Sequence, residues 1–226
     1  MSASPFDLPL DRLPAELPIF PLTGALLLPR GRLPLNIFEP RYLAMIEDAL
    51  GAGRLVGMVQ PRVPGEAGLS VDDGTAVYPV GCAGRITSFQ ETEDGRFVLS
   101  LWGVCRFAIA AELPGRRGYR RVRADWSRWA ADIAGDGPED GIDRPSLLAA
   151  LRAYFSRHGI DTDWTAVERT PTARLVTMVA MGCPFAPQEK QALLEAPDLG
   201  ARAALLRDLA EAGRHESATG GSSTVN

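Results

Sequence analysis

The chain has 226 residues, 46% of them apolar and 23% charged, with 24 basic and 28 acidic side chains and a net charge of −4. This balance is typical of a globular protein with a core of its own, and the acidic total disfavours nonspecific nucleic-acid binding. Lys190 is the one lysine among the basic residues. A P-loop is excluded because its lysine must follow a glycine, whereas Lys190 lies in PQEKQ.

Neither end of the sequence predicts export or membrane insertion. The N-terminal stretch MSASPFDLPLDRLP lacks the basic residues and the apolar run of a signal peptide. No apolar run approaches the roughly 18 residues that a membrane helix needs. Cys82, Cys105 and Cys183 are odd in number and far apart in the sequence, which predicts buried free thiols in a reducing compartment. We therefore expect a cytoplasmic protein that makes no membrane contact.

The first half of the chain predicts short strands with one early helix. The helix begins at EPRY, where Pro40 suits the first turn, and it ends at Gly51. The longest strand, RFVLSLWGVCRFAIAAEL, alternates apolar and more polar residues over most of its length. The predicted extended segments are 17–22, two short pieces within 25–38, 55–61, 77–92, 96–113 and 119–126, with a hairpin turn at 93–95.

The second half predicts helices. Leucines and aromatic residues recur at helical spacing, Asp143 and Asp198 suit N-caps, and Gly159 suits a helix end. The predicted helices are 144–159, 172–182, 187–196 and 199–212. We therefore divide the chain into a lead-in (1–16), a β-barrel unit (17–129), an acidic glycine-rich linker (130–143), a helical unit (144–215) and a disordered tail (216–226).

The order of these elements predicts an α+β fold. Period-two strands without βαβ alternation favour a small antiparallel β-barrel with one early helix over a parallel sheet. A C-terminal helical bundle follows it. The sequence contains no internal repeats.

The sequence offers no constellation typical of catalysis or metal binding. His158 and His215 are far apart and belong to no metal-ligand pattern. The acidic clusters, Asp72–Asp73, QETEDG and GDGPEDGID, lie in predicted turns and the linker, where turn chemistry and solubility explain them. An unrecognised hydrolase that uses Glu91, Glu93 or Asp94 remains an alternative. We expect no catalytic residue, no metal and no cofactor.

Two surface features could bind a partner. The basic stretch RRGYRRVR (116–123) could clamp nucleic acid with its arginines and Tyr119, although the acidic total charge favours a solvated hairpin. Trp102 and Arg106 lie on the less apolar face of the long strand. They could line an exposed groove, or the helical unit could cover them.

The opening segment LPIFPLTGALLLPRGRLPLNIFEPRY resembles the start of the N-terminal substrate-binding domain of ATP-dependent Lon proteases. VGCAGRITSF, GVCRFAI and FAPQEKQALLEAPDLGARAALL resemble later motifs of that family, with Cys82 where threonine is usual. The resemblance covers residues 17 to about 212 and implies a PUA-like β pseudobarrel followed by helices. It also implies a role in capturing unfolded or tagged polypeptides. The Walker motif of the Lon ATPase module does not occur in this sequence.

The resemblance makes a non-catalytic peptide- or protein-binding module, with a role in protein quality control, the leading hypothesis. Its partners would be unfolded or tagged polypeptides or other proteins, captured by strand addition or groove packing. An RNA-binding PUA-like module that uses residues 116–123 is the alternative. Glu39, Arg41 and Tyr42 of FEPRY favour structural roles, with ligand contact as the second reading. The candidate binding residues are Arg41, Tyr42, Trp102, Arg106, Arg121 and Arg123. The sequence does not identify the ligand or the oligomeric state.

Overall fold

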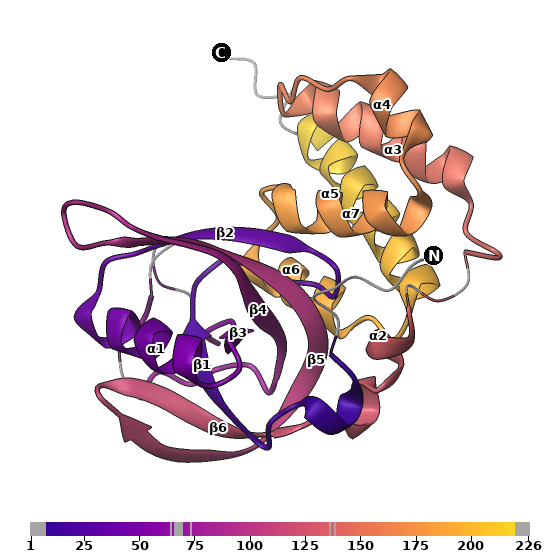
Figure 1. The fold of residues 1–226 in the computed structure, drawn as a ribbon. Helices are drawn as coiled ribbons and strands as arrows, with labels where there is room; N and C mark the ends of the chain where they lie inside the picture. The colour runs from indigo at the N-terminus through magenta and orange to yellow at the C-terminus, as the bar shows by residue number, and fades with distance from the viewer. Residues whose placement is uncertain are drawn as a thin grey trace. The chain divides into compact units, whose positions relative to one another are not determined.

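The computed structural model describes residues 8–63, 65, 70–72, 74–135, 137 and 139–219 (Figure 1). In the described part of the chain up to residue 125, strands predominate with one α-helix among them, and helices follow. The strands are β1 (Glu16–Pro21), β2 (Arg32–Ile37), β3 (Leu55–Val59), β4 (Val80–Glu91), β5 (Phe97–Arg116) and β6 (Tyr119–Asp125). The α-helices are α1 (Pro40–Gly51), α2 (Ala131–Ala134), α3 (Arg144–Arg157), α4 (Trp164–Arg169), α5 (Thr172–Gly182), α6 (Pro187–Glu195) and α7 (Leu199–Thr219), with short 3-10 helices at Leu10–Arg12 and Ser127–Trp129.

The six strands form one mixed sheet in the order β2-β5-β4-β3-β1-β6, and a further pairing of β5 with β6 closes it. The long strand β5 makes this closure possible, because its first half pairs with β2 and its second half with β6. The predicted α+β fold with a β pseudobarrel and helices after it is confirmed.

One pairing departs from the antiparallel prediction. β1 and β3 run parallel, with Ile19 opposite Gly57 and Pro21 opposite Val59. Parallel strands need a long crossover, and the chain between β1 and β3 supplies one that contains β2 and α1. The alternation within single strands carries no information about this pairing.

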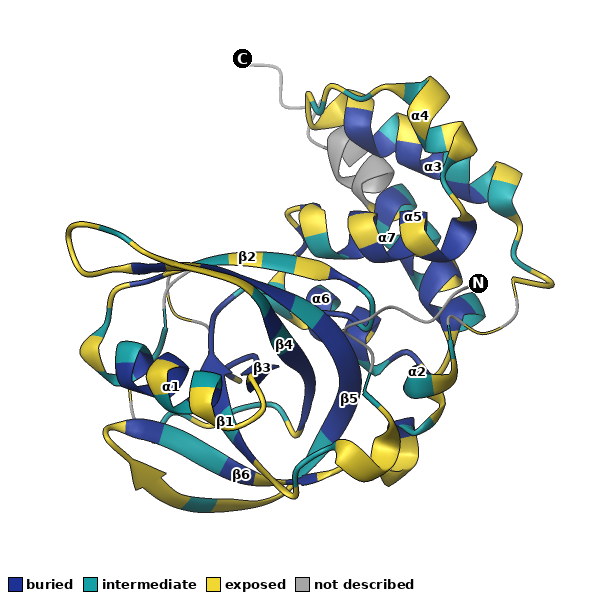
Figure 2. Ribbon diagram, viewed as in Figure 1, coloured by how far each residue is buried: buried dark blue, intermediate teal, exposed yellow. Residues whose placement is uncertain are grey.

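Strand β2 is an edge strand of the sheet. Among the described strands it pairs only with β5, from Arg32 opposite Trp102 to Ile37 opposite Phe97. Figure 2 shows exposed and intermediate colours alternating along β2 up to the buried Ile37, whereas β3 is buried throughout. Pro34 lies in the middle of β2, which suits an edge because proline cannot donate a ladder hydrogen bond.

Apolar side chains from all parts of the ring fill the barrel. Gly57 permits close packing there, because a Cβ at that position would lie 2.8 Å from both Leu17 and Phe107. Fully buried large side chains in this core include Leu17, Ile19, Leu26, Leu27, Leu28, Ile86, Leu99, Leu101 and Phe107.

The chain divides by its packing contacts into two compact units. The first comprises residues 1–136 and 177–195 and contains the barrel with α1 and α6, and the second comprises 137–176 and 196–226. In the second unit α3 packs against α7. The carboxylate of Asp143 accepts the Ser146 N–H at 3.0 Å and that of Asp198 accepts the Ala201 N–H at 2.8 Å, which confirms both predicted N-caps.

The structure differs from the sequence expectations at three places along the helical half. The predicted linker contains α2, whose Asp132 is buried, and the short helix α4 lies where no helix was expected. Helix α7 continues to Thr219, into the predicted tail, and residues 220–226 lie outside the described part. A helix of six residues such as α4 carries too little periodicity to be predicted, and an Asp163 N-cap stabilises it locally.

Candidate functional site

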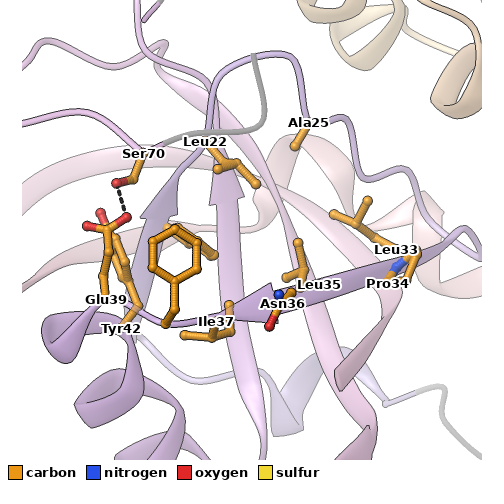
Figure 3. A pocket seen from close by; sticks show the side chains of 12 residues that line it. Leu22, Ala25, Leu33, Pro34, Leu35, Asn36, Ile37, Glu39, Tyr42 and Ser70 are labelled. Carbon is orange, nitrogen blue, oxygen red and sulfur yellow. Dashed lines mark hydrogen bonds between the residues drawn. The ribbon is translucent and has the colours of Figure 1, made fainter. Parts of the chain in front are cut away.

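An apolar pocket of about 370 Å³ lies between β2, the segment that follows β1, and the start of α1 (Figure 3). Leu22 and Ala25 lie on one side of it, and Leu35 and Ile37 of β2 on the other. The volume is within the range of about 300–1,000 Å³ that is usual for ligand pockets. The remaining lining residues are Phe20, Leu33, Pro34, Asn36, Phe38, Glu39, Tyr42 and Ser70.

Aromatic packing forms the floor of this pocket. The rings of Phe20 and Tyr42 lie 4.2 Å apart between centroids, and both side chains are buried. Phe38 at the rim is 51% exposed, one of the most exposed large apolar side chains among the described residues. A pocket with a buried aromatic floor and an exposed aromatic rim favours an apolar ligand.

Charged groups border the pocket at the start of α1. The Glu39 carboxylate accepts hydrogen bonds from the Ser70 hydroxyl and from Arg41 Nε, the latter at 3.1 Å. Arg41 also donates to the Val71 carbonyl at 3.0 Å, and its guanidinium lies 4.8 Å from the centre of the Tyr42 ring. The FEPRY segment therefore ties the loop at residues 70–71 to the helix.

The single lysine of the chain binds the segment after β1 that forms the Leu22 and Ala25 side of the pocket. Lys190 of α6 is buried, and its Nζ donates to the Gly24 carbonyl at 2.8 Å, one residue before Ala25. Burial lowers the pKa of Lys190. The Gly65 N–H donates to the buried Thr23 hydroxyl at 3.0 Å. The wall of the pocket is thus fixed from two directions.

A second hollow, of about 520 Å³, lies between the end of α1 and the strands β1 and β6. Tyr119 donates its hydroxyl to Asp48 at 2.7 Å, and Arg117 donates to Asp48 at 3.0 Å. The Tyr119 hydrogen bond is the largest cause of the lowered pKa of Asp48. Arg116 and Arg121, which also line this hollow, form ion pairs with Asp48 and Glu16.

Acidic partners accompany most of the basic stretch 116–123. Besides those two pairs, Arg117 binds Glu47 at 2.6 Å and Arg120 binds Glu112 at 2.6 Å. A nucleic-acid phosphate would have to displace these carboxylates before it could bind the same guanidinium groups. The ion pairs therefore favour the solvated-hairpin reading of this stretch over the RNA-binding alternative.

Arg106 is buried, with 4% of its surface exposed, and so cannot line an exposed groove. Its Nε and an Nη bind the two carboxylate oxygens of Asp132 at 2.9 and 2.7 Å, and another Nη donates to the Leu194 carbonyl at 3.0 Å. The Trp129 ring lies 3.8 Å from its guanidinium carbon. The alternative in which later parts of the chain cover Arg106 agrees with this environment.

The other candidate binding residues are dispersed. Tyr42 lines the apolar pocket and Arg121 lines the second hollow. Trp102 is half-buried on β5 opposite Arg32, and Arg123 is exposed on β6 opposite Glu16. The structure therefore does not unite the six candidates in one site, and their binding roles stay predictions.

The three cysteines are free and buried, as predicted. Burial raises the pKa of the Cys105 thiol to about 12 and that of Cys183 to about 11. Both thiols are therefore protonated at neutral pH, and only a thiolate is strongly nucleophilic.

We expect Ellman's reagent at pH 7.5 to label none of the three thiols of the native protein within minutes. In guanidinium chloride all three should react, because unfolding exposes them and returns the pKa values of Cys105 and Cys183 to the ordinary range. Rapid labelling of even one thiol in the native protein would contradict this prediction.

Other kinds of site are not evident in the described part of the chain. It contains no group of three or more His, Cys, Asp or Glu side chains placed to hold a metal ion. None of its helices is long and apolar enough to cross a membrane. Asp73 and the side chain of His215, both considered from the sequence, lie outside the described residues.

These features define a class of protein: a β pseudobarrel module with an apolar pocket at an edge strand, followed by helices. A family model for the ATP-dependent protease La (LON) substrate-binding domain matches residues 16–211, and the chain belongs to that family.

Relatives and solved structures agree with this assignment. Lon protease 2 of Myxococcus xanthus is 27% identical over 201 residues, which cover 88% of this chain and 24% of that protein. Lon protease 2 of Sorangium cellulosum (strain So ce56) is 28% identical over 208 residues, again 88% of this chain and 24% of the relative. The chain thus spans about a quarter of these relatives.

A crystal structure of a Lon N-terminal domain protein from Xanthomonas campestris has a TM-score of 0.57 at 24% identity, covering 84% of this chain and 96% of that one. The N-terminal domain of the Mycobacterium avium complex Lon protease has a TM-score of 0.56 at 15% identity. The match covers 87% of this chain and 98% of that one. Both likenesses support the fold.

Sequence reasoning missed most of the pocket. Leu33, Leu35 and Ile37 read as ordinary strand core, and Ala25 carries no chemical signal of its own. The alternation of these three apolar residues around Pro34 was the available signal, since proline marks an edge strand. Only the fold shows that no described strand covers that edge.

Proposed function

We propose that this protein binds unfolded or tagged polypeptides through the apolar pocket at β2 and α1, as a non-catalytic recognition module of protein quality control in the cytoplasm. Membership of the LON substrate-binding domain family supports a role in substrate recognition. The apolar pocket is the observation that supports this location of the binding site. Half-buried Leu33 and Leu35 and exposed Phe38 lie around it.

Unfolded polypeptides differ from folded ones in exposing apolar side chains, which folded proteins bury. A pocket that accepts one or two such side chains therefore distinguishes the two states without reading a particular sequence. Removing apolar surface from water stabilises such a complex by about 25 cal/mol per Å² before the costs of association are subtracted. Moderate affinity is expected, which suits capture and release.

The test is to fill the pocket. We expect Ala25→Trp to weaken binding of a fluorescently labelled, reduced and carboxymethylated globular protein at least tenfold in a polarisation titration, because the indole would occupy the ligand's space. Ala25 is half-buried in an irregular segment and its side chain faces the pocket, so the barrel core is left intact.

Met178→Trp is the matched control. Met178 is 56% exposed on α5 and does not line the pocket, so this change adds the same side chain elsewhere. We expect its affinity to stay within twofold of the unsubstituted protein. Unchanged binding by Ala25→Trp, in a protein with native circular dichroism, would refute the proposed site.

A further inference from the structure

One row of backbone groups of strand β2 has no strand partner among the described residues, and we call this row the open edge. β5 takes up one side of β2, and none of the described strands pairs with the other side. An open edge of this kind is a template for another extended chain. In this molecule the open edge borders the apolar pocket, because every residue from Leu33 to Ile37 lines that pocket.

One hydrogen bond beside β2 shows which residues of the strand face outwards. The Gly103 N–H of β5 donates to the carbonyl of Gly31, the residue directly before β2, at 2.8 Å. Backbone groups along an antiparallel strand point alternately toward and away from the partner. Since the backbone carbonyl of Gly31 points toward β5, the backbone N–H and C=O groups of Leu33, Leu35 and Ile37 also point toward β5. The N–H and C=O groups of Arg32, Pro34 and Asn36 therefore belong to the open edge.

Pro34 makes this edge asymmetric, because proline has a carbonyl group but no N–H. The open edge offers three acceptors, at Arg32, Pro34 and Asn36, and only two donors, at Arg32 and Asn36. An incoming strand must therefore supply an N–H opposite Pro34, while its own carbonyl there finds no donor on β2.

A second copy of this chain matches the edge poorly. If two β2 strands paired antiparallel with Pro34 opposite Pro34, neither would supply the N–H that the other's carbonyl needs. An unrelated polypeptide without proline at this point supplies it. The hydrogen-bonding groups of the edge thus favour a foreign extended chain as the occupant.

The side chains of an added strand would alternate between the two faces of the sheet. Residues opposite Leu33, Leu35 and Ile37 would lie on the same face as these three apolar side chains, beside the pocket wall formed by Leu22 and Ala25 (Figure 3). Apolar residues at every second position of the ligand would therefore reach the pocket.

We propose that the captured polypeptide adds to the open edge of β2 as an extra strand, with the Pro34 carbonyl accepting one of its N–H groups and alternate apolar side chains entering the pocket. This rests on the proposed function and specifies its binding mode. The ligand class is an extended segment with apolar residues two apart and no proline opposite Pro34. The backbone pairing adds affinity without reading side chains, and the pocket selects for apolar ones.

Backbone methylation of a ligand tests this mode. Overlapping ten-residue peptides from the carboxymethylated protein are screened, and the tightest binder is resynthesised with one N-methyl group at each position in turn. We expect affinity losses of tenfold or more at alternate positions and less than about threefold between them. If the parent peptide binds but the losses show no period of two, strand addition is wrong and pocket binding stands. If no peptide binds, the proposed function itself fails.

A pair of protein variants tests the same edge from the other side. Asn36→Pro removes one of the two open N–H groups, and it breaks no bond to β5 because that group points away. Asn36→Ala removes the same side chain but keeps the N–H. We expect Asn36→Pro to lower the affinity for the parent peptide at least tenfold and Asn36→Ala to lower it less than twofold. The melting temperatures of both variants should stay near that of the unsubstituted protein.

Equal peptide affinities of these two variants would overturn the proposal. So would sedimentation of the peptide-free protein as a dimer that Asn36→Pro dissociates, since a second copy would then occupy the edge.

Discussion

Asp132→Ala is expected to lower the free energy of unfolding by about 3–5 kcal/mol, the range for breaking a buried ion pair by removing one partner. The carboxylate is 9% exposed and accepts three hydrogen bonds from Arg106, one from its backbone N–H and two from its guanidinium. Alanine would remove both oxygens and the negative charge that binds the buried guanidinium. Urea denaturation followed by tryptophan fluorescence measures the loss.

Two further variants separate the ion pair from general damage to α2. Replacing both partners, Arg106→Met with Asp132→Leu, should recover much of the stability, because a buried pair contributes little over apolar residues of similar volume. Glu47→Ala, which breaks the exposed pair with Arg117, should change the stability far less than Asp132→Ala does, because solvent screens an exposed pair. A single Asp132→Ala variant no less stable than Glu47→Ala would contradict this account of the segment after β6.

Gly103→Ala should cost about 3 kcal/mol, at the upper end of the range for overpacked sites. A Cβ at Gly103 would lie 1.9 Å from the Leu28 carbonyl oxygen and 2.7 Å from its carbon. Both contacts are with backbone, so no side-chain rotation can relieve them. The segment after β1 would have to move away from β5, and with it the Ala25 wall of the pocket. The melting temperature in thermal denaturation and the affinity for unfolded polypeptides should therefore both fall.

Gly51→Ala is the matched control for this substitution. Gly51 ends α1, its φ is not in the left-handed region, and a Cβ there would meet no atom within 4 Å. Alanine should therefore leave stability unchanged or raise it by up to about 1 kcal/mol through its helix propensity. If the Gly103→Ala variant were as stable as the Gly51→Ala variant, residues 28–31 could not cross β5 as closely as described.

Local features were predictable from the sequence because their causes are local. The N-caps at Asp143 and Asp198 depend on residues within one helical turn, and Pro40 begins α1 through its own restricted backbone. Strand β5 was predictable because apolar and more polar residues alternate along most of its length. Motifs such as LPIFPL and FEPRY added the family resemblance, which the match over residues 16–211 confirms.

The pocket and the Arg106 site depend on residues brought together from distant parts of the chain. The sequence left open whether Arg106 lines an exposed groove or is covered, and in the structure it binds Asp132 of α2 and the Leu194 carbonyl of α6. The parallel pairing of β1 with β3 likewise depends on how the crossover folds back. The amino-acid sequence by itself determined most of the strands and the longer helices, because propensities, caps and periodicity act between near neighbours. Only the tertiary structure decided which polar groups are buried together and which edge stays open, because those outcomes depend on pairing between segments whose order in space no local pattern encodes.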